Sequence, residues 1–478
     1  MLKPTCFFLI ALLNVLSAVG QVKNFSSSGQ QITKFDILGN TVDAHDGMIA
    51  YFNETYYLYG TSYDCGFEWN NKTAPFCGFK VYTSKDLVNW KDEGFLFDAQ
   101  NQVWQTRCDG KTYGCFRPHV VYNRKSQQYV LWINVYDNVV GYRVFTSQSP
   151  AGPFIEVAEP KLAINHDKPA AGLNNGDHDL FVDDDGTAYL ALTDWRANGA
   201  IAIEQLNDDY LSGTGKVVTQ VTEGKTEAPA LFKRKGVYYI TYSDPNCGYC
   251  SGTGTSYKTA SAVFGPWSAG KKISDNSCGG QPSFVSTIKL PGDTIFLYGS
   301  DLWNNAAKNE ALANFYWMPL VFEYDGSIRP MECLQYFGAG DKKITDPDKD
   351  SAAFKTVCEI NNKETRWQSF KANRSGKLAR FQIPVLKSGY PGSGLIIDFY
   401  ELNGNQKTLL QSLQIPADSI GWSAKQITIH PDMAVEKNKE YQFVLRTESA
   451  TGCFGYARQV SGVDANTSPG IKFNLLVE

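Results

Sequence analysis

Residues 180–194 read LFVDDDGTAYLALTD, which is an apolar strand, a polar turn of aspartates and glycine, and a second strand of apolar and aromatic residues. This order is typical of a β-hairpin. The same order recurs at residues 48–62, 120–134, 231–243 and 284–300. A hairpin that returns five times at intervals of about 50 to 70 residues indicates a repeat architecture.

A second segment follows each hairpin and predicts a third strand, a turn and a short outer strand. These segments lie at residues 79–90, 142–154, 200–213, 256–267 and 315–326. Four strands per unit in five units predict an all-β fold with a five-bladed β-propeller over residues 21–340. The alternative is a set of coincidental hairpins in an unrelated β fold.

The pattern changes near residue 341. Residues 341–355 are polar and charged, and we expect them to form a linker. Short alternating strands at residues 378–386, 394–402, 426–429 and 440–447 then predict a jelly-roll-like β-sandwich over residues 356–478. The sequence leaves open whether this accessory domain binds carbohydrate or caps the propeller.

The first twenty residues resemble an export signal. Lys3 supplies a positive start, residues 6–15 are apolar, and Ala18-Val19-Gly20 fits a cleavage site. We therefore expect a signal peptide at residues 1–20 and a secreted, extracellular mature protein.

Cysteine content agrees with an oxidising compartment. Of the 11 cysteines, only Cys6 lies in the expected signal, which leaves an even number for disulfides. The close pairs Cys65/Cys77 and Cys108/Cys115 are predicted to bond, whereas the other six cannot be paired from sequence. N-glycosylation sequons begin at Asn24, Asn53, Asn71, Asn373 and Asn466.

The charge pattern narrows the possible partners. The net charge is −4, and no basic run or basic amphipathic helix occurs. The sequence therefore gives no indication of a nucleic-acid or membrane partner. We expect a monomer that needs no cofactor, with a structural cation on the propeller axis left open.

Candidate catalytic residues stand just ahead of the innermost strands, which converge on the axis of a propeller. Asp46, Asp177 and Glu227 precede an aromatic residue of the following strand by 11 or 12 residues in units one, three and four. Arg117 takes the matching position in unit two, and Gln281 in unit five. Three carboxylates are thus expected to face one another.

Carboxylates crowded in one place are costly unless they have partners or a task. An inverting glycosidase needs such a set, because one protonated carboxyl must act as an acid while an ionised one activates water. The alternative is a catalytically silent propeller that only binds carbohydrate.

Several motifs resemble glycoside hydrolase family 43. They are HDGMI at residues 45–49, YYLYG at 56–60, VYTSKDLVNW at 81–90, DHDLFVDDDGTAY at 177–189 and TEAPALFKRKG at 226–236. The resemblance implies a five-bladed propeller that acts as an inverting, exo-acting glycosidase on side chains of galactan, arabinogalactan, arabinan or xylan. It also implies that Asp46 is the general base, Asp177 the pKa modulator and Glu227 the general acid.

Some positions depart from the family pattern. Gly47 stands where the family usually has Pro, Ala228 where it usually has Gly, and Gln281 where many members have His. The context of Glu227 and Gln281 resembles the exo-β-1,3-galactanase branch, although that branch usually lacks the base that Asp46 provides. The expected substrate-binding residues, which share positions at or just beyond the inner strands, are His45, Arg117, His178, Trp195, Gln281 and Trp303. For the histidines, a purely structural role is the alternative.

Overall fold

The protein was analysed as a computed structural model. It describes residues 21–66, 75–108, 114–136, 141–163, 175–244, 252–290, 293–303, 309–338, 353–404, 406–460 and 470–478. The expected signal peptide, most of the expected linker, Cys247, Cys250, and the sequons at Asn71 and Asn466 lie outside these residues.

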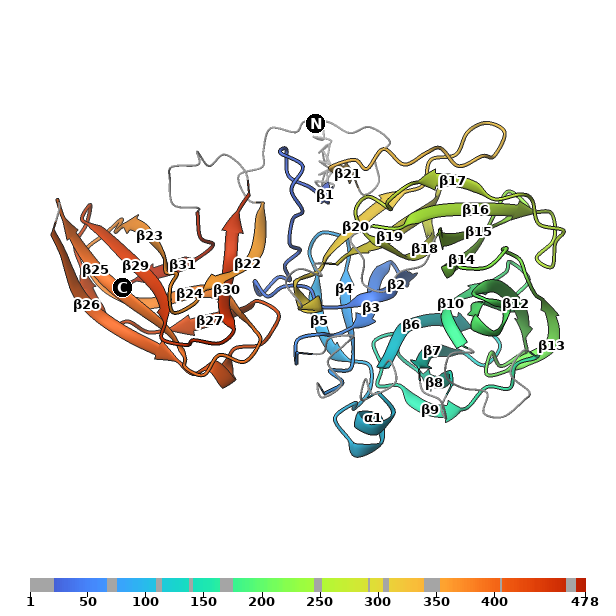
Figure 1. Cartoon of the computed structure of the whole chain (residues 1–478), viewed down its shortest axis with the longest axis horizontal. Helices are drawn as coiled ribbons and strands as arrows, with labels where there is room; N and C mark the ends of the chain where they lie inside the picture. The colour runs from blue at the N-terminus through green and yellow to red at the C-terminus, as the bar shows by residue number, and fades with distance from the viewer. Residues whose placement is uncertain are drawn as a thin grey trace, which may run out of the picture.

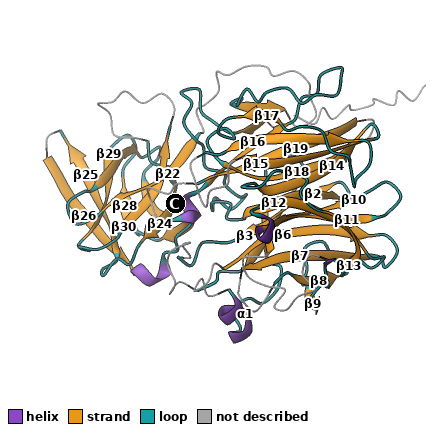
Figure 2. Cartoon of the chain, turned by 45° about the vertical axis from the view of Figure 1, so that its right-hand side comes forward, coloured by secondary structure: helices purple, strands orange, loops and turns teal. Residues whose placement is uncertain are grey.

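Within the described residues the fold is built almost entirely from β-strands, so the prediction of an all-β protein is confirmed (Figure 2). One α-helix is present in these residues, α1 (Gln102–Arg107), and Asn101 caps its N-terminus by accepting a hydrogen bond from the Trp104 N–H. Short 3₁₀ turns occupy Trp195–Ala197, Glu310–Leu312 and Ala417–Ser419.

Five antiparallel sheets follow one another along the chain. The first contains β2 (His45–Phe52), β3 (Thr55–Thr61), β4 (Phe79–Ser84) and β5 (Lys91–Phe95). The second contains β6 (Gly114–Asn123), β7 (Gln128–Tyr136), β8 (Arg143–Ser147) and β9 (Ile155–Ala158). The third contains β10 (Asn175–Val182), β11 (Ala188–Asp194), β12 (Ala200–Leu206) and β13 (Gly213–Val218). The fourth contains β14 (Glu227–Arg234), β15 (Val237–Asp244), β16 (Gly254–Ala260) and β17 (Lys271–Ser274), and the fifth β18 (Gln281–Leu290), β19 (Asp293–Leu302) and β20 (Asn314–Pro319).

The five sheets are arranged in a closed ring. In each sheet the strands pair in chain order, so the first strand forms one edge. The first strand of each sheet contacts the first strand of the next, and β18 contacts β2. Figure 1 shows the sheets following one another around the right-hand part of the molecule. The residues that lead into these five strands are therefore brought together.

The fifth sheet corrects one detail of the sequence prediction. Four strands were expected in every unit, but this sheet has three in the described residues. β20 ends at Pro319, and the chain then folds back on itself, with a bridge between Phe322 and Ile328 and a hydrogen bond from the Arg329 N–H to the Val321 carbonyl. These residues therefore pair with one another instead of adding a fourth strand to the sheet. At the start of the chain, β1 (Gln21–Lys23) pairs instead with β21 (Tyr336–Gly338).

Aromatic side chains fill the spaces between neighbouring sheets. Trp90 and Trp317 are almost fully buried and meet edge to face, with ring centroids 5.6 Å apart. Trp132 is buried in the cluster shared by the second and third sheets. Each ring of this size buries about 150–250 Å², worth several kcal/mol at about 25 cal/mol per Å². This packing fixes the spacing of the sheets and therefore of the residues at their inner edges.

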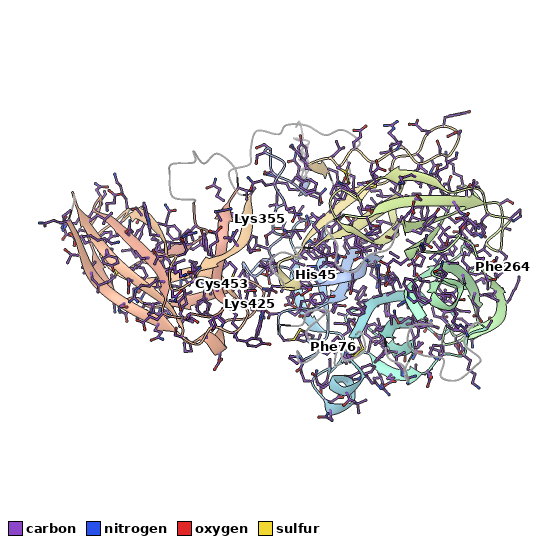
Figure 3. All side chains as sticks on the ribbon, in the orientation of Figure 1. His45, Phe76, Phe264, Lys355, Lys425 and Cys453 are labelled. Carbon is purple, nitrogen blue, oxygen red and sulfur yellow. A yellow bond between two sulfur atoms is a disulfide. The ribbon has the colours of Figure 1, made fainter. Side chains whose placement is uncertain are left out.

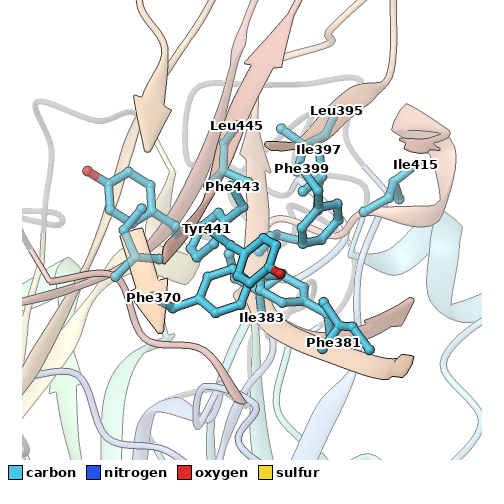
Figure 4. Packing of buried hydrophobic residues seen from close by; sticks show 14 of the residues in the cluster. Phe370, Phe381, Ile383, Leu395, Ile397, Phe399, Ile415, Tyr441, Phe443 and Leu445 are labelled. Atoms are coloured by element: carbon cyan, nitrogen blue, oxygen red, sulfur yellow. The ribbon is translucent and has the colours of Figure 1, made fainter. Parts of the chain in front are cut away.

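The C-terminal residues form two further antiparallel sheets. One contains β22 (Phe354–Ile360), β30 (Cys453–Gln459), β24 (Gly376–Ser388) and β27 (Lys425–Ile429), with β28 (Met433–Val435) and β31 (Asn474–Val477) also paired to β24. The other contains β23 (Arg366–Lys371), β29 (Glu440–Thr447), β25 (Leu395–Asn403) and β26 (Gln406–Ile415). Side chains from both sheets, including Phe381, Phe399 and Phe443, share one core (Figure 4).

Disulfides cross-link the chain both in the ring of five sheets and in the C-terminal sheets. The predicted pairs Cys65–Cys77 and Cys108–Cys115 are confirmed. Two pairs that the sequence could not assign are Cys278–Cys333 and Cys358–Cys453. No helix in the described part of the chain is long and apolar enough to cross a membrane.

The sequon at Asn24 is not suited to carry a glycan. Asn24 is fully buried, and its amide donates to the Trp317 carbonyl at 2.8 Å and accepts from the Trp317 N–H at 3.0 Å. Asn53 and Asn373 are exposed.

Candidate active site

A β-bulge interrupts each inner strand at or next to the position that the sequence singled out. The register shifts fall between His45 and Met48, Phe116 and His119, Asn175 and His178, Glu227 and Ala230, and Pro282 and Phe284. A bulge adds one residue to a strand and turns a side chain away from the regular alternation. Five bulges on one ring therefore turn side chains of all five strands away from the regular pleat.

The bulges place non-glycine residues in the left-handed region of backbone space. Asp46 has φ 55°, Arg117 has φ 59° and Ala228 has φ 52°. Such a conformation costs a non-glycine residue about 1–2 kcal/mol, so surrounding contacts must hold it. Gly47 fits this arrangement, because a Cβ there would lie 2.2 Å from the Tyr59 carbonyl oxygen.

Asp46 is a buried carboxylate with several donors. Thr61 Oγ1 donates to Oδ1 at 2.7 Å, and Tyr63 Oη donates to Oδ2 at 3.2 Å. Burial raises the pKa of Asp46 to about 7, with a smaller contribution from the negative charge of Asp301, although Arg117 and the Thr61 hydrogen bond oppose this rise. This carboxyl therefore ionises near neutral pH.

Arg117 connects its own sheet, the second, to three others. Its Nη2 donates to Asp177 Oδ2 at 2.8 Å, and its Nη1 donates to the Ser283 carbonyl at 2.8 Å. Its backbone N–H points at Asp46 Oδ1, at 3.4 Å. Burial opposes its charge, but the carboxylates of Asp177, Asp46 and Glu227 raise the pKa of Arg117 overall. A permanent cation thus sits among the three candidate carboxylates.

Glu227 has a different environment. Gln281 Nε2 donates to Glu227 Oε1 at 2.7 Å, and Trp303 Nε1 donates to Gln281 Oε1 at 3.1 Å. Glu227 is 8% exposed, as are Asp46 and Asp177. Of the predicted catalytic and binding residues, six are therefore joined directly or through neighbours: Asp46, Arg117, Asp177, Glu227, Gln281 and Trp303.

The predicted histidines lie deeper. His45 is fully buried, stacks on Phe315 with ring centroids 4.7 Å apart, and lies 3.3 Å from Asp301 Oδ1 through Nδ1. His178 is also fully buried, between the rings of His119 and Tyr142, and burial lowers its pKa well below the usual value. Both histidines are therefore more completely buried than the three carboxylates.

Trp195 opens a 3₁₀ turn directly after β11. Its indole lies against the backbone of two glycines, since a Cβ on Gly176 or Gly199 would come within 2.8 Å of it. Trp195 packs on an apolar cluster that contains Tyr63, Phe116 and Trp303. The two tryptophans predicted to bind substrate therefore belong to one aromatic group next to Asp46.

Sequence reasoning missed one residue of the site, Asp301. Asp301 Oδ2 accepts from the Asp46 N–H at 3.0 Å and from the Ser283 hydroxyl. A signal for it existed, because the residues opposite the site strands are polar in all five sheets: Thr61, Asn134, Asp194, Ser243 and Asp301.

No group of three or more His, Cys, Asp or Glu side chains within the described ranges is placed to hold a metal ion.

The model of glycosyl hydrolases family 43 matches residues 40–286, which is more than half of the chain and includes Asp46, Asp177, Glu227 and Gln281. The chain belongs to this family. It is therefore an enzyme, a glycosidase.

Individual members of the family are similar over different lengths. The β-D-galactofuranosidase of Aspergillus niger is 27% identical over 270 residues, which cover 54% of this chain and 74% of that protein. A family 43 β-1,3-galactosidase solved with galactodeoxynojirimycin is 26% identical and has a TM-score of 0.51, covering 62% of this chain and 96% of its own. The exo-β-1,3-galactanase of Phanerochaete chrysosporium, solved with β-1,3-galactotriose, is 19% identical with a TM-score of 0.54. It covers 92% of this chain and 99% of its own, so the likeness in fold extends over most of the C-terminal sheets.

Proposed function

We propose that this family 43 glycosidase is a secreted, exo-acting, inverting enzyme that releases terminal sugars from β-linked galactan chains. Its architecture would be a five-bladed propeller at residues 21–340, a linker at 341–355 and a C-terminal β-sandwich at 356–478. The closed ring of inner strands supports the propeller, and the shared core of the last two sheets supports the sandwich. Four disulfides support secretion, and we propose a monomer without a cofactor.

One observation carries the proposal. Asp46 and Asp177 both contact Arg117, whereas Glu227 accepts a hydrogen bond from the neutral amide of Gln281. Catalysis by two carboxyl groups requires that their environments differ, so that one donates a proton while the other accepts one. The environment of Glu227 thus differs from that of Asp46 and Asp177, as this division of roles requires.

In the proposed reaction Glu227 is the general acid. It gives its proton to the glycosidic oxygen as the bond from that oxygen to the anomeric carbon breaks. Gln281 donates to Oε1, so the transferable proton would reside on Oε2. Asp46, with its pKa near 7, takes a proton from a water that attacks the anomeric carbon from the opposite face. The carboxyl groups of inverting enzymes lie roughly 6.5–9.5 Å apart, which leaves room for this water.

Arg117 and Asp177 would act as a positioning pair. The guanidinium holds the Asp177 carboxylate in place by a hydrogen bond of 2.8 Å, and its charge also interacts with Glu227. Arg117, Gln281, Trp195 and Trp303 are the proposed contacts for the sugar, with aromatic rings meeting the C–H faces of a pyranose. We assign no sugar contact to His45 or His178, because both are fully buried.

The choice of galactan rests on two relatives. The β-1,3-galactosidase is the solved family member that shares 26% identity, and the Phanerochaete exo-galactanase matches both the ring of five sheets and most of the C-terminal part. Arabinan and xylan are the alternatives that the family resemblance implies.

The test is a substrate panel with a matched inactive variant. The wild-type chain and Glu227→Gln are assayed on β-1,3-galactan, arabinan and xylan, and on aryl glycosides of the corresponding sugars. We expect galactose release by the wild type alone, and NMR of the fresh product should show the inverted anomer. Hydrolysis of another polymer would replace the substrate assignment. A retained anomer would reject the inverting mechanism, and full activity of Glu227→Gln would reject its role.

A further inference from the structure

The C-terminal sheets contact the ring of five sheets directly beside the candidate active site. Asp64, which follows Tyr63, accepts hydrogen bonds from the Ser423 N–H at 2.8 Å and the Ser423 hydroxyl at 2.7 Å, and it pairs with Lys425. Figure 3 labels His45 and Lys425 on the two sides of this boundary. The segment from 421 to 425 therefore packs against the loop that carries Tyr63, the residue whose hydroxyl donates to Asp46.

This contact brings one aromatic ring of the C-terminal part to the site. Trp422 packs on the apolar cluster of Tyr63, Phe116 and Trp303. The backbone of Gly66 lies directly on the indole, since a Cβ there would be 2.7 Å from the ring. The Trp422 carbonyl accepts from Asn309 Nδ2 at 3.1 Å, and its N–H donates to the Asp64 carbonyl at 3.2 Å. Four separate segments thus fix the position of this ring.

The Trp422 ring extends a buried aromatic cluster that begins next to Asp46. Tyr63 donates to Asp46, and the Trp303 ring meets Tyr63 edge to face at 5.7 Å. Trp195 and Trp422, both partly exposed, pack on this pair. Beyond Trp422, Tyr390 lies edge to face at 5.7 Å and is 64% exposed. Tyr390 therefore contacts the Trp422 ring while most of its own side chain faces solvent.

We propose that Trp422 and Tyr390 form a subsite for a sugar unit of the polymer beyond the bond that is cleaved, and that the C-terminal part thereby completes the substrate site. The ligand class is a neutral pyranose, because aromatic rings bind the apolar C–H face of a sugar. The ammonium of Lys387 lies 4.5 Å from the indole centroid and donates to the Ala417 carbonyl at 2.7 Å, so its charge is already engaged. This inference rests on the proposed function and names a further part of the same site.

The test compares a polymer with a small substrate. Kinetics of Tyr390→Ala, Trp422→Ala and Trp422→Phe are measured in the full chain on galactan and on an aryl galactoside, which has no sugar at the proposed subsite. The matched control is Tyr324→Ala, because Tyr324 is a fully exposed tyrosine outside both sites. Loss of one stacking contact of about 1 kcal/mol should lower kcat/KM on the polymer about fivefold in Tyr390→Ala through KM, with the aryl substrate unchanged. Trp422→Phe should recover part of the loss in Trp422→Ala.

The outcomes separate this inference from the proposed function. If Tyr390→Ala and Trp422→Phe match the wild type on the polymer, or if every variant loses both activities in parallel, the subsite is rejected while the catalytic assignment stands. If the wild type instead cleaves arabinan or xylan, kcat/KM of the variants is compared with that of the wild type on that polymer and on the corresponding aryl glycoside. If the wild type cleaves nothing, the proposed function fails, and retardation of each variant in galactan-containing gels still decides whether Tyr390 binds the chain.

Discussion

The backbone N–H of Asp46 donates a hydrogen bond to Asp301 Oδ2 at 3.0 Å, so a carboxylate from the fifth sheet holds the candidate base of the first. The same oxygen accepts from the Ser283 hydroxyl, and Oδ1 faces His45 Nδ1 at 3.3 Å. Asp301 is almost fully buried. It supports the left-handed backbone at Asp46 and adds a negative charge that raises the pKa of that residue.

The first prediction follows for Asp301→Asn. Asparagine keeps an oxygen that accepts from the Asp46 N–H but removes the charge, so the pKa of Asp46 should fall. Because the base must be ionised, the acidic limb of kcat/KM, expected near pH 7 in the wild type, should move to lower pH. The pH profile on an aryl glycoside measures this shift. Asp325→Asn, at an exposed carboxylate, is the control, and an unmoved limb with normal rates would exclude charge coupling between the two residues.

The second prediction separates the acid from the base. General acid–base catalysis contributes about 10²–10⁴-fold, so Glu227→Gln and Asp46→Asn should each lose about that much on galactan. An activated aryl glycoside has a leaving group that needs no proton. Its hydrolysis should therefore survive in Glu227→Gln far better than in Asp46→Asn. Equal losses on both substrates would mean that the two roles are wrongly assigned.

The repeat was readable from sequence because each hairpin carries its own local signal. Alternating apolar residues and polar turns place the strands, and the pairing of β2 with β3 and of β10 with β11 follows the predicted hairpins. Counting back from the second strand singled out Asp46, Asp177 and Glu227 because units one, three and four repeat a spacing of 11 or 12 residues. The prediction of four strands was wrong for the fifth sheet, which has three in the described residues because the chain leaves the repeat after Pro319.

The contacts between the repeated units could not be predicted from the sequence. The bulge at Asp46 and its bond to Asp301 join residues 255 positions apart, and no local pattern encodes such a pair. The same holds for Trp422, whose place beside Tyr63 depends on the docking of the C-terminal sheets. The burial of individual side chains could not be predicted from the sequence either. His45 and His178 stand next to catalytic candidates in the chain, yet both side chains point inward and are fully buried.

The third prediction concerns Arg117→Met. Methionine has a similar length but leaves Asp177 buried without its cation, and breaking a buried pair in this way costs about 3–5 kcal/mol. Urea unfolding at pH 8 should show this loss. The loss should be smaller at pH 5, where Asp46 is protonated and needs no neutralisation. Arg329→Met removes a surface arginine and should change the free energy of unfolding little. Wild-type stability in Arg117→Met at both pH values would contradict the role of Arg117 as the central cation.

The fourth prediction is that Asp46→Asn stabilises the protein at neutral pH while it abolishes activity. Asp46 has a pKa of about 7 in the folded state, and burial similarly raises the pKa of Asp179 to about 7, against about 3.9 in an unfolded chain. At these two positions the folded state binds more protons than the unfolded chain between these values, so their contribution to stability falls as the pH rises from about 4 to 7. Asparagine carries no charge to bury, so the free energy of unfolding of Asp46→Asn should exceed that of the wild type at pH 8, with the excess shrinking toward pH 4.

Urea unfolding of both proteins at pH 4.5, 6 and 8 measures this difference. Asp325→Asn is the matched control, because its carboxyl is exposed and the Ser327 hydroxyl and N–H lower its pKa. Any stability that Asp325 contributes is fully present above about pH 4. The free energy of unfolding of Asp325→Asn should therefore differ from that of the wild type by the same amount at all three pH values. A constant difference for Asp46→Asn as well would mean that Asp46 is already ionised throughout this range, and the role of a base poised near neutrality would be lost.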